Sequence, residues 1–332
     1  MNAAPTAMDV EIAARRIGSF VARTPLLTSD VLNKISGGQV FLKAECMQHT
    51  GSFKLRGAIN KMQNLSINDR RDGVIAWSSG NHAQAVAAAA RQTGTSAKIV
   101  MPSDAPTIKI DGTRAHGAEI IFYDRATEDR EAIAQQIAKE DGRVIIPSYD
   151  DPDIIAGQGT VGLELVDQAY ELGVTLQDII VPVSGGGLLA GIGLAVKSRQ
   201  PNTKLYSVEP DGFDDHRQSL ESGQREINPK LAGSLCDALL APTPGFLTWP
   251  INQIQLDGGY AITEKQALSA MAFAHTHLNL KLEPSGALPL AAIITRVHSC
   301  QGRSVALVLS GGNVDIEIFA RAFSDDVVQH IE

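Results

Sequence analysis

The segment Thr50-Gly-Ser-Phe-Lys-Leu-Arg-Gly57 carries the most information about the fold of this 332-residue chain. It places Lys54 directly after an aromatic residue and between two glycines, where a helical pattern begins. A lysine held in a dry, crowded site loses its proton more readily and attacks a carbonyl carbon to form a Schiff base. The same segment also suits an ordinary lysine on an exposed helix, so its meaning depends on the rest of the chain.

Short β-rich runs alternate with longer helical patterns on both sides of this segment. Each run is followed by glycine, serine or proline, and the runs lie at 74–77, 98–101, 119–123, 179–183, 205–208 and 304–309. Such alternation is typical of parallel sheets with crossover helices. It predicts an α/β protein of two lobes, each a mostly parallel open sheet with flanking helices. We expect a small domain, residues 73–150, inserted into a large domain made of residues 1–72 and 151–332.

The composition fits a globular protein of the cytoplasm. Hydrophobic residues make up 44% of the chain and charged residues 20%, and the net charge of -8 argues against a nucleic-acid surface. No window approaches 18 uninterrupted apolar residues, and the N-terminus does not read as a secretory signal. The cysteines at positions 46, 236 and 300 are far apart and odd in number, which predicts reduced thiols without metal-ligand spacing.

A second segment, Val181-Pro-Val-Ser-Gly-Gly-Gly-Leu-Leu-Ala-Gly191, follows a predicted strand and opens a predicted helix. Its glycines let backbone N–H groups turn inward, and the helix N-terminus adds its dipole, which together make a cradle for a phosphate group. The spacing Gly185-x-Gly187-x-x-Ala190 also fits a dinucleotide-binding fingerprint, with Glu209 placed to hold a ribose hydroxyl. On this segment alone both interpretations stand.

Two polar loops also follow predicted strands. The loop Trp77-Ser-Ser-Gly-Asn-His-Ala-Gln84 offers hydroxyls, an amide and free N–H groups to a carboxylate, although a well-capped helix would use similar residues. The loop Leu309-Ser-Gly-Gly-Asn-Val314 would place Ser310 at the carboxyl edge of the sheet, where open α/β folds bind ligands, unless it is a simple polar turn.

An acidic segment, residues 208–216, follows the strand after the glycine-rich loop. It gathers five residues that can bind a cation, namely Glu209, Asp211, Asp214, Asp215 and His216. Oxygen ligands at such close spacing suit a hard cation such as Mg²⁺ or Ca²⁺. A solvated acidic turn is the alternative.

Taken together, these segments resemble the pyridoxal-phosphate enzymes of the tryptophan-synthase β-subunit fold, known as fold type II. The resemblance is to the group of serine/threonine dehydratases (threonine ammonia-lyases) and serine racemases, and it extends from about residue 10 to about residue 320. Five motifs occur in the order of that family: Gly51-Ser-Phe-Lys-Leu-Arg-Gly57, Ser78-Ser-Gly-Asn-His82, Ser184-Gly-Gly-Gly-Leu188, Glu209 to Asp215, and Ser310-Gly-Gly-Asn313.

The resemblance implies how pyridoxal 5'-phosphate and substrate are bound. Lys54 would hold the cofactor through a Schiff base and move the Cα proton, while Phe53 packs on the ring. Asn81 would approach the ring hydroxyl, and Ser310 would face the pyridine nitrogen. The phosphate would bind to the glycine-rich loop, that is Ser184, Gly185, Gly186, Gly187 and Leu188. The substrate carboxylate would be received by Ser78, Ser79, Asn81 and His82.

The resemblance also bears on a metal ion and on stereochemistry. In racemase-like members the acidic segment binds a divalent cation (Mg²⁺, Ca²⁺ or Mn²⁺), and the carry-over names the carboxylates of Glu209 and Asp215 and the backbone carbonyl of Phe213. Ser79 stands where many threonine-specific dehydratases have alanine. A serine there can protonate Cα from the face opposite Lys54 in racemase-like members, and it also occurs in members that mainly eliminate.

The resemblance therefore predicts a cytoplasmic, homodimeric dehydratase that converts L-threonine or L-serine to a 2-oxo acid and ammonia by β-elimination. A 3-hydroxyaspartate dehydratase or a serine racemase on the same scaffold is the alternative. A second substrate carboxylate would need another cation, for which Arg56 and Arg130 are candidates. A nicotinamide-dependent dehydrogenase, from a different class, would leave the segments around Lys54 and Ser310 unexplained, and a non-catalytic binding module would leave Lys54 without a role.

Overall fold

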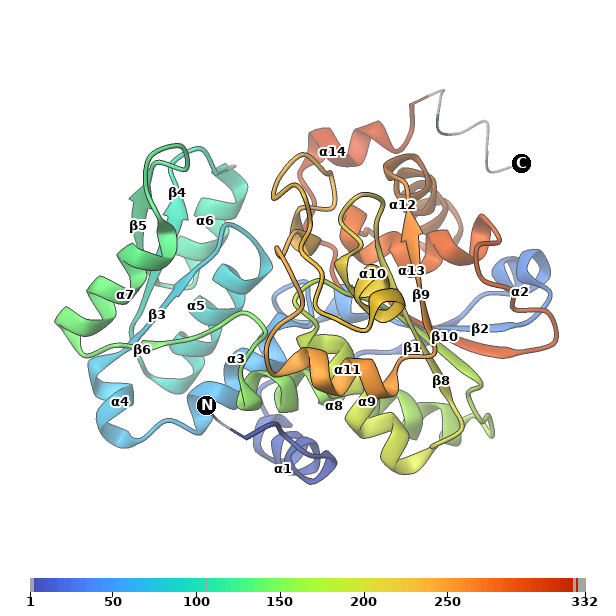
Figure 1. Ribbon diagram of the computed structural model, residues 1–332, viewed down its shortest axis with the longest axis horizontal. Coiled ribbons are helices and arrows are strands. Elements are labelled where there is room, and N and C mark those ends of the chain that lie inside the picture. The colour runs from blue at the N-terminus through green and yellow to red at the C-terminus, as the bar shows by residue number, and fades with distance from the viewer. Residues whose placement is uncertain (1–2, 106, 325–326, 328–332) are drawn as a thin grey trace.

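The computed structural model describes residues 3–105, 107–324 and 327, and it consists of two α/β lobes (Figure 1). The larger lobe contains a six-stranded sheet with the order β1-β2-β10-β7-β8-β9, and the smaller lobe contains a four-stranded sheet with the order β5-β4-β3-β6. Every strand pair in these two sheets is parallel except β1 with β2. The predicted α/β fold with two mostly parallel open sheets is therefore confirmed.

The large sheet brings together strands from both ends of the chain. Its strands are β1 (Leu26–Thr28), β2 (Gln39–Lys43), β7 (Asp178–Pro182), β8 (Lys204–Pro210), β9 (Gly258–Ile262) and β10 (Ser304–Val308). The central strands β7 and β10 are buried almost throughout, because helices cover both faces of the sheet. This explains why they read as continuous apolar runs in the sequence.

The small sheet is formed by one continuous part of the chain. Its strands are β3 (Val74–Trp77), β4 (Ala97–Pro102), β5 (Glu119–Tyr123) and β6 (Val144–Ile145). Helices α5 (Asn81–Thr93), α6 (Thr107–Ala115) and α7 (Arg130–Asp141) connect these strands. The boundaries of the inserted domain at residues 73 and 150 stay a prediction.

The remaining helices belong mostly to the larger lobe. They are α1 (Ala7–Ile17), α2 (Asp30–Ser36), α3 (Lys54–Gln63), α4 (Ile67–Asp72), α8 (Pro152–Glu171), α9 (Gly187–Arg199), α10 (Asp215–Ser222), α11 (Thr248–Gln255), α12 (Glu264–Leu278), α13 (Pro284–Ile294) and α14 (Ile316–Arg321), with short 3-10 turns at Glu45–Met47 and Asp237–Leu239. Among the residues that the structure describes, no helix is long and apolar enough to cross a membrane.

Helix α3, which begins at Lys54, lies at the junction of the two lobes (Figure 1). Its apolar residues pack in one cluster with strands β3 and β4 and helix α5 of the small lobe. Its other side contacts α8, where a Cβ on Gly157 would lie only 2.7 Å from the Cα of Gly57. Glycine at both positions lets the two backbones approach closely, which fixes the start of α3 relative to the larger lobe.

A buried ion network holds the same helix. The guanidinium of Arg56, fully buried, donates to Glu45 Oε2 at 2.8 Å and to Glu164 Oε1 at 2.7 Å. Lys43 Nζ also donates to Glu164, at 2.6 Å. Both edges of the Arg56 guanidinium are therefore bonded to carboxylates. Arg56 consequently anchors α3 and does not receive a second substrate carboxylate, which corrects one of our two candidates for that role.

Candidate active site

The segment that carries Lys54 and the segment that carries Ser310 run side by side. Ser52 and Gly311 form an isolated antiparallel bridge, and the N–H of Phe53 donates to the carbonyl of Ser310 at 3.2 Å. The Ser310 segment directly follows β10, so it lies at the carboxyl edge of the large sheet. Two motifs that are about 250 residues apart in the sequence thus meet at the edge where parallel α/β sheets bind ligands.

Lys54 lies in a partly buried position with a lowered pKa. Its Nζ donates to the carbonyl of Ser148 at 2.9 Å and lies 5.2 Å from the centre of the Phe53 ring. Burial lowers the pKa of Lys54 to about 8, and the nearby carboxyl of Glu283 opposes part of that shift. More of this lysine is therefore uncharged near neutral pH than of an exposed lysine, which is the condition for a nucleophilic amine.

Asn81, the first residue of α5, is held by two residues of the larger lobe. Its Nδ2 donates to Glu283 Oε1 at 2.7 Å, and its Oδ1 accepts from Asn313 Nδ2 at 2.8 Å. Our sequence analysis gave no role to Glu283 or Asn313. The sequence held one signal for Glu283, because this acidic residue directly precedes helix α13, whose residues are apolar apart from Ser285.

The serine loop before α5 leaves the start of that helix open. Gly80 occupies the N-cap position and provides no side-chain cap, while Ser78 Oγ accepts from the N–H of Gly80 at 3.2 Å. Ser78 and Ser79 are half-buried. A helix start without a side-chain cap presents free N–H groups and the positive end of its dipole, which suits a carboxylate.

His82 is buried and faces the small sheet. Its Nε2 lies 2.9 Å from the carbonyl oxygen of Ile146. Because a carbonyl oxygen can only accept a hydrogen bond, Nε2 carries the proton. Burial, together with the charge of Lys54, lowers the pKa of His82 to about 3. The His82 ring is therefore neutral, and its single N–H is bonded to the Ile146 carbonyl within the small lobe.

The glycine-rich loop between β7 and α9 is shaped by residues on both sides. Gly186 has a φ of +94°, and a Cβ on Gly185 would overlap the ring of Tyr149. Thr248 Oγ1 donates to the Gly185 carbonyl at 2.6 Å, and Ser184 Oγ accepts from the N–H of Ala241 at 3.0 Å. Helix α9 has no side-chain cap at its N-terminus, so its free N–H groups suit a phosphate, as the sequence predicts.

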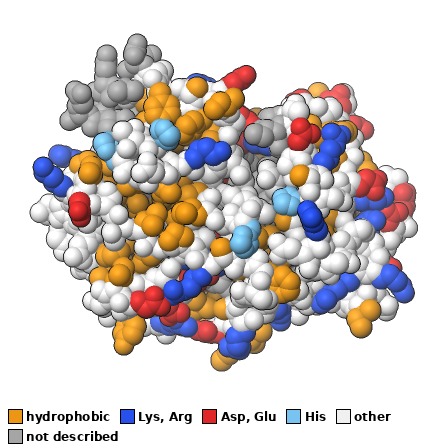
Figure 2. Space-filling view, turned by 180° about the vertical axis from the view of Figure 1, so that it is seen from behind, with side chains coloured by type: hydrophobic (Ala, Val, Ile, Leu, Met, Phe, Trp, Pro, Cys, Tyr) orange, Lys and Arg blue, Asp and Glu red, His pale blue; other side chains and the backbone are white. Residues whose placement is uncertain are grey.

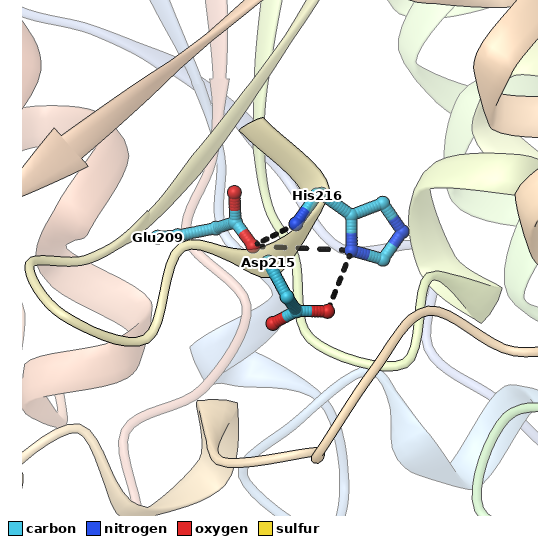
Figure 3. A group of neighbouring side chains, drawn as sticks. All are labelled: Glu209, Asp215 and His216. Atoms are coloured by element: carbon cyan, nitrogen blue, oxygen red, sulfur yellow. Dashed lines mark hydrogen bonds and ion pairs between the residues drawn. The ribbon is translucent and has the colours of Figure 1, made fainter. Parts of the chain in front are cut away.

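The acidic segment forms a compact cluster at the start of α10 (Figure 3). Glu209, Asp215 and His216 each offer a ligand atom, and these atoms lie within 4.8 Å of one another. Asp215 Oδ2 and His216 Nδ1 are buried and have no hydrogen-bond partner among the residues that the structure describes. Burial, followed by the neighbouring charge of Asp215, raises the pKa of Glu209 well above its usual range. A divalent cation would offset this repulsion and satisfy both unpartnered atoms.

The structure brings together three of the residues predicted to bind a cation. Of the five candidates in the acidic segment, Glu209, Asp215 and His216 come together, and His216 is the one that the resemblance did not imply as a ligand. Phe213 is buried in the turn between β8 and α10, and the ligand role of its carbonyl stays a prediction. Asp214 is engaged elsewhere, because its carboxylate accepts from Arg217 Nε at 2.7 Å.

The cluster also contacts the glycine-rich loop. Asn252 Nδ2 lies 3.2 Å from His216 Nε2 and 3.3 Å from the carbonyl oxygen of Gly186. A cation bound at the cluster would therefore be linked to the phosphate cradle through His216 and Asn252.

The site combines a nucleophilic lysine at the carboxyl edge of a parallel sheet with two open helix starts, one suited to a phosphate and one to a carboxylate. This arrangement fits an enzyme that binds an amino acid beside a phosphorylated cofactor. The comparisons with known proteins agree. A family model described as "Pyridoxal-phosphate dependent enzyme" matches residues 17–311.

Relatives and solved structures cover nearly the whole chain. An L-threo-3-hydroxyaspartate ammonia-lyase from Saccharomyces cerevisiae is 40% identical over 96% of this chain and 97% of its own. The crystal structure of T.th. threonine deaminase is 42% identical, with a TM-score of 0.88 over 94% of this chain and 99% of that one. Maize serine racemase is 35% identical, with a TM-score of 0.90 over 99% of this chain and 100% of that one.

The chain belongs to the family of pyridoxal-phosphate-dependent enzymes, in the group with the hydroxy amino acid ammonia-lyases and serine racemases. This membership removes the dinucleotide interpretation of the glycine-rich loop. It also removes the interpretation of the chain as a non-catalytic binding module.

Proposed function

We propose that this enzyme is a dehydratase of β-hydroxy amino acids, with L-threonine or L-serine as its substrate. It removes the Cα proton and the β-hydroxyl group, and hydrolysis of the resulting enamine gives a 2-oxo acid and ammonia. The observation that carries the proposal is the position of Lys54, whose segment pairs with the Ser310 segment at the carboxyl edge of the large sheet and whose Nζ donates to the carbonyl of Ser148 at 2.9 Å. Burial also lowers the pKa of this amine to about 8.

The residues around Lys54 fit pyridoxal phosphate. The glycine-rich loop offers free N–H groups of α9 to the phosphate, and Gly185 leaves no room there for a Cβ. We propose that Lys54 holds the cofactor, that Phe53 packs on its ring, and that Ser310 faces the pyridine nitrogen. When bound, the cofactor supplies an electron sink for the bond that breaks at Cα.

The chain's own residues then act on the substrate. The free N–H groups at the start of α5, with the hydroxyls of Ser78 and Ser79, bind the α-carboxylate and orient Cα. The amine of Lys54 accepts the Cα proton, since its lowered pKa leaves it partly uncharged near neutral pH. Because the only N–H of the His82 ring is bonded to Ile146, we propose that His82 contributes its main-chain N–H.

Ser79 makes a serine racemase the alternative on the same scaffold. We propose that its hydroxyl lies on the face of Cα opposite Lys54, where it can return a proton. The Ser79→Ala variant then keeps elimination from L-serine and loses D-serine formation. If D-serine formation persists in Ser79→Ala, another group protonates that face.

We propose that Glu209, Asp215 and His216 bind a divalent cation, with Mg²⁺ as the first choice because the ligands are mainly oxygen atoms. The unpartnered atoms Asp215 Oδ2 and His216 Nδ1 support this. The proposed role of the cation is structural: it stabilises the region around the glycine-rich loop. The cluster contacts this loop through Asn252 and lies outside the Lys54 contacts described above.

A 3-hydroxyaspartate dehydratase is the second candidate, and the yeast relative with that activity in its name favours it. Arg130 stays a candidate for the second carboxylate; it is exposed at the first position of α7 in the small lobe. The Arg130→Ala variant separates the two functions. It loses activity with hydroxyaspartate and keeps it with L-threonine if Arg130 binds the distal carboxylate.

A product assay tests the proposed function. The protein is loaded with pyridoxal phosphate and Mg²⁺ and offered L-threonine, L-serine, D-serine and the isomers of 3-hydroxyaspartate, and 2-oxo acid, ammonia and enantiomers are measured. Rapid formation of 2-oxobutyrate from L-threonine supports the dehydratase. Preferential release of oxaloacetate from a hydroxyaspartate, or of D-serine from L-serine, assigns the enzyme to one of the alternatives.

We also propose that the enzyme is a cytoplasmic homodimer. Hydrophobic side chains gather on the larger lobe on the face opposite to that of Figure 1 (Figure 2). A groove of about 270 Å³, lined in part by Ile35, Phe273 and Ile294, lies between α2, α12 and α13. Two-fold symmetric dimers are the commonest soluble oligomers, and sedimentation of the loaded protein as a monomer would contradict this.

A further inference from the structure

Four segments of the site are joined by one continuous run of hydrogen bonds. Asn313 Nδ2 donates to the carbonyl of Thr50 at 2.8 Å and to Asn81 Oδ1, also at 2.8 Å. Asn81 Nδ2 in turn donates to Glu283 Oε1 at 2.7 Å. The run therefore starts beside the Lys54 segment, passes through the small lobe at Asn81, and ends at the residue before α13.

The number of hydrogens in this run fixes the orientation of the Asn81 amide. A side-chain amide has two N–H hydrogens and one carbonyl oxygen. Both hydrogens of Asn313 are used, and one of them is donated to Asn81 Oδ1. Asn81 must therefore point its oxygen at Asn313 and its nitrogen at Glu283. One N–H of Asn81 is left after the bond to Glu283.

The carboxyl of Glu283 is well placed to enforce this orientation. Glu283 is only 4% exposed, and a Cβ on Gly311 would overlap its Oε1, so the carboxyl is packed against the Gly311 backbone. Burial and the charge of Asp237 raise the pKa of Glu283 to about 8, against the opposing effects of Asn81, Lys109 and Lys54. The protonated and ionised carboxyl both offer an acceptor oxygen, so the Asn81 amide stays oriented in either state.

We propose that Glu283 and Asn313 are positioning residues that orient the Asn81 amide, so that its remaining N–H donates to an oxygen of the bound cofactor. This inference rests on the proposed function, because it assumes that pyridoxal phosphate binds beside Lys54. Glu283 and Asn313 come from the larger lobe and Asn81 from the small lobe. The orientation of the donor therefore depends on how the two lobes meet.

Three variants test the proposal. Glu283→Gln keeps an acceptor at the same place, whereas Glu283→Leu removes it. Asn313→Asp keeps the side-chain shape but cannot donate to Asn81 Oδ1, so the amide has to turn around. Glu140→Gln, on the exposed surface of α7, is the control for the loss of one negative charge. Thermal unfolding of each variant shows that it is folded.

The readouts are the dissociation constant of pyridoxal phosphate, measured by titration of the cofactor-free protein, and the visible absorption band of the loaded protein. A lost hydrogen bond to a charged oxygen corresponds to a change of about tenfold or more. We expect Asn313→Asp and Glu283→Leu to raise the dissociation constant by about that factor and to shift the band. We expect Glu283→Gln and Glu140→Gln to stay within about threefold of the wild type.

Two results overturn the inference. One is an unchanged dissociation constant and band in Asn313→Asp. The other is a loss in Glu283→Gln as large as in Glu283→Leu, because charge rather than orientation would then matter. If Glu283→Leu does not fold, Asn313→Asp carries the test by itself. A wild-type protein that binds no pyridoxal phosphate would instead contradict the proposed function, so the two failures are distinguishable.

Discussion

Replacement of Arg56 by methionine is the perturbation that best tests how the Lys54 helix is held. Methionine approximates the length of the arginine stem and removes the guanidinium, which bonds to Glu45 and Glu164. Glu45 is then left fully buried without its cationic partner. Removal of one partner from a buried ion pair costs about 3–5 kcal/mol, a large part of a total stability of about 5–15 kcal/mol.

The free energy of unfolding is measured by urea denaturation of the wild type, Arg56→Met, Glu45→Gln and the double variant. We expect the single Arg56→Met change to cost about 3–5 kcal/mol. Part of that loss should return in the double variant, since a neutral glutamine leaves no uncompensated charge, and the coupling should exceed about 1 kcal/mol.

A different result would refute the reasoning. If Arg56→Met changes stability by less than about 1 kcal/mol and instead raises KM for a dicarboxylic substrate, Arg56 serves the substrate and not the helix. The same holds if the two substitutions are additive, because Arg56 and Glu45 would then not depend on one another.

Three further predictions follow from other groups. Folding raises the pKa of Glu283 from 4.5 to about 8, so the folded protein binds this proton more tightly and loses stability as pH rises between these values. The Glu283→Gln variant should lose this pH dependence of stability. Equal urea midpoints for the wild type and the variant at every pH would contradict the prediction. Mg²⁺ should raise the unfolding temperature of the wild type and not that of Asp215→Asn, and an equal rise in both would exclude the cluster as the binding site. Gly185→Ala forces its Cβ against the Tyr149 ring, so it should weaken pyridoxal-phosphate binding at least about tenfold in a fluorescence titration, and unchanged binding would show that the loop has room to adjust.

The sequence predicts much of this architecture, because strand and helix patterns are local. The apolar runs at 179–183 and 304–309 correspond to β7 and β10, which are buried in the centre of the large sheet. The glycines at 185–187 signal a tight turn before a helix, and Gly186 does adopt a positive φ. Local sequence therefore located the strand-to-helix turn at which we propose that the cofactor phosphate binds.

Contacts between distant segments were harder to predict. Glu283 and Asn313 meet Asn81 only because β10 and α13 come together in the fold, and nothing near either residue in the sequence shows that partner. Arg56 looked free to bind a substrate, since its partner Glu164 lies more than a hundred residues away. Ion pairs of this kind depend on the packing of whole helices, which a single sequence does not reveal.

The most direct test of the account is to identify the lysine that carries the cofactor. The protein is loaded with pyridoxal phosphate, reduced with borohydride, digested and analysed by mass spectrometry, with Lys54→Ala and Lys61→Ala as matched variants on the same helix. We predict that the pyridoxyl group is found on Lys54, that Lys61→Ala is labelled like the wild type, and that Lys54→Ala is not labelled. Labelling of a different lysine in the wild type, or undiminished labelling of Lys54→Ala, would contradict the account.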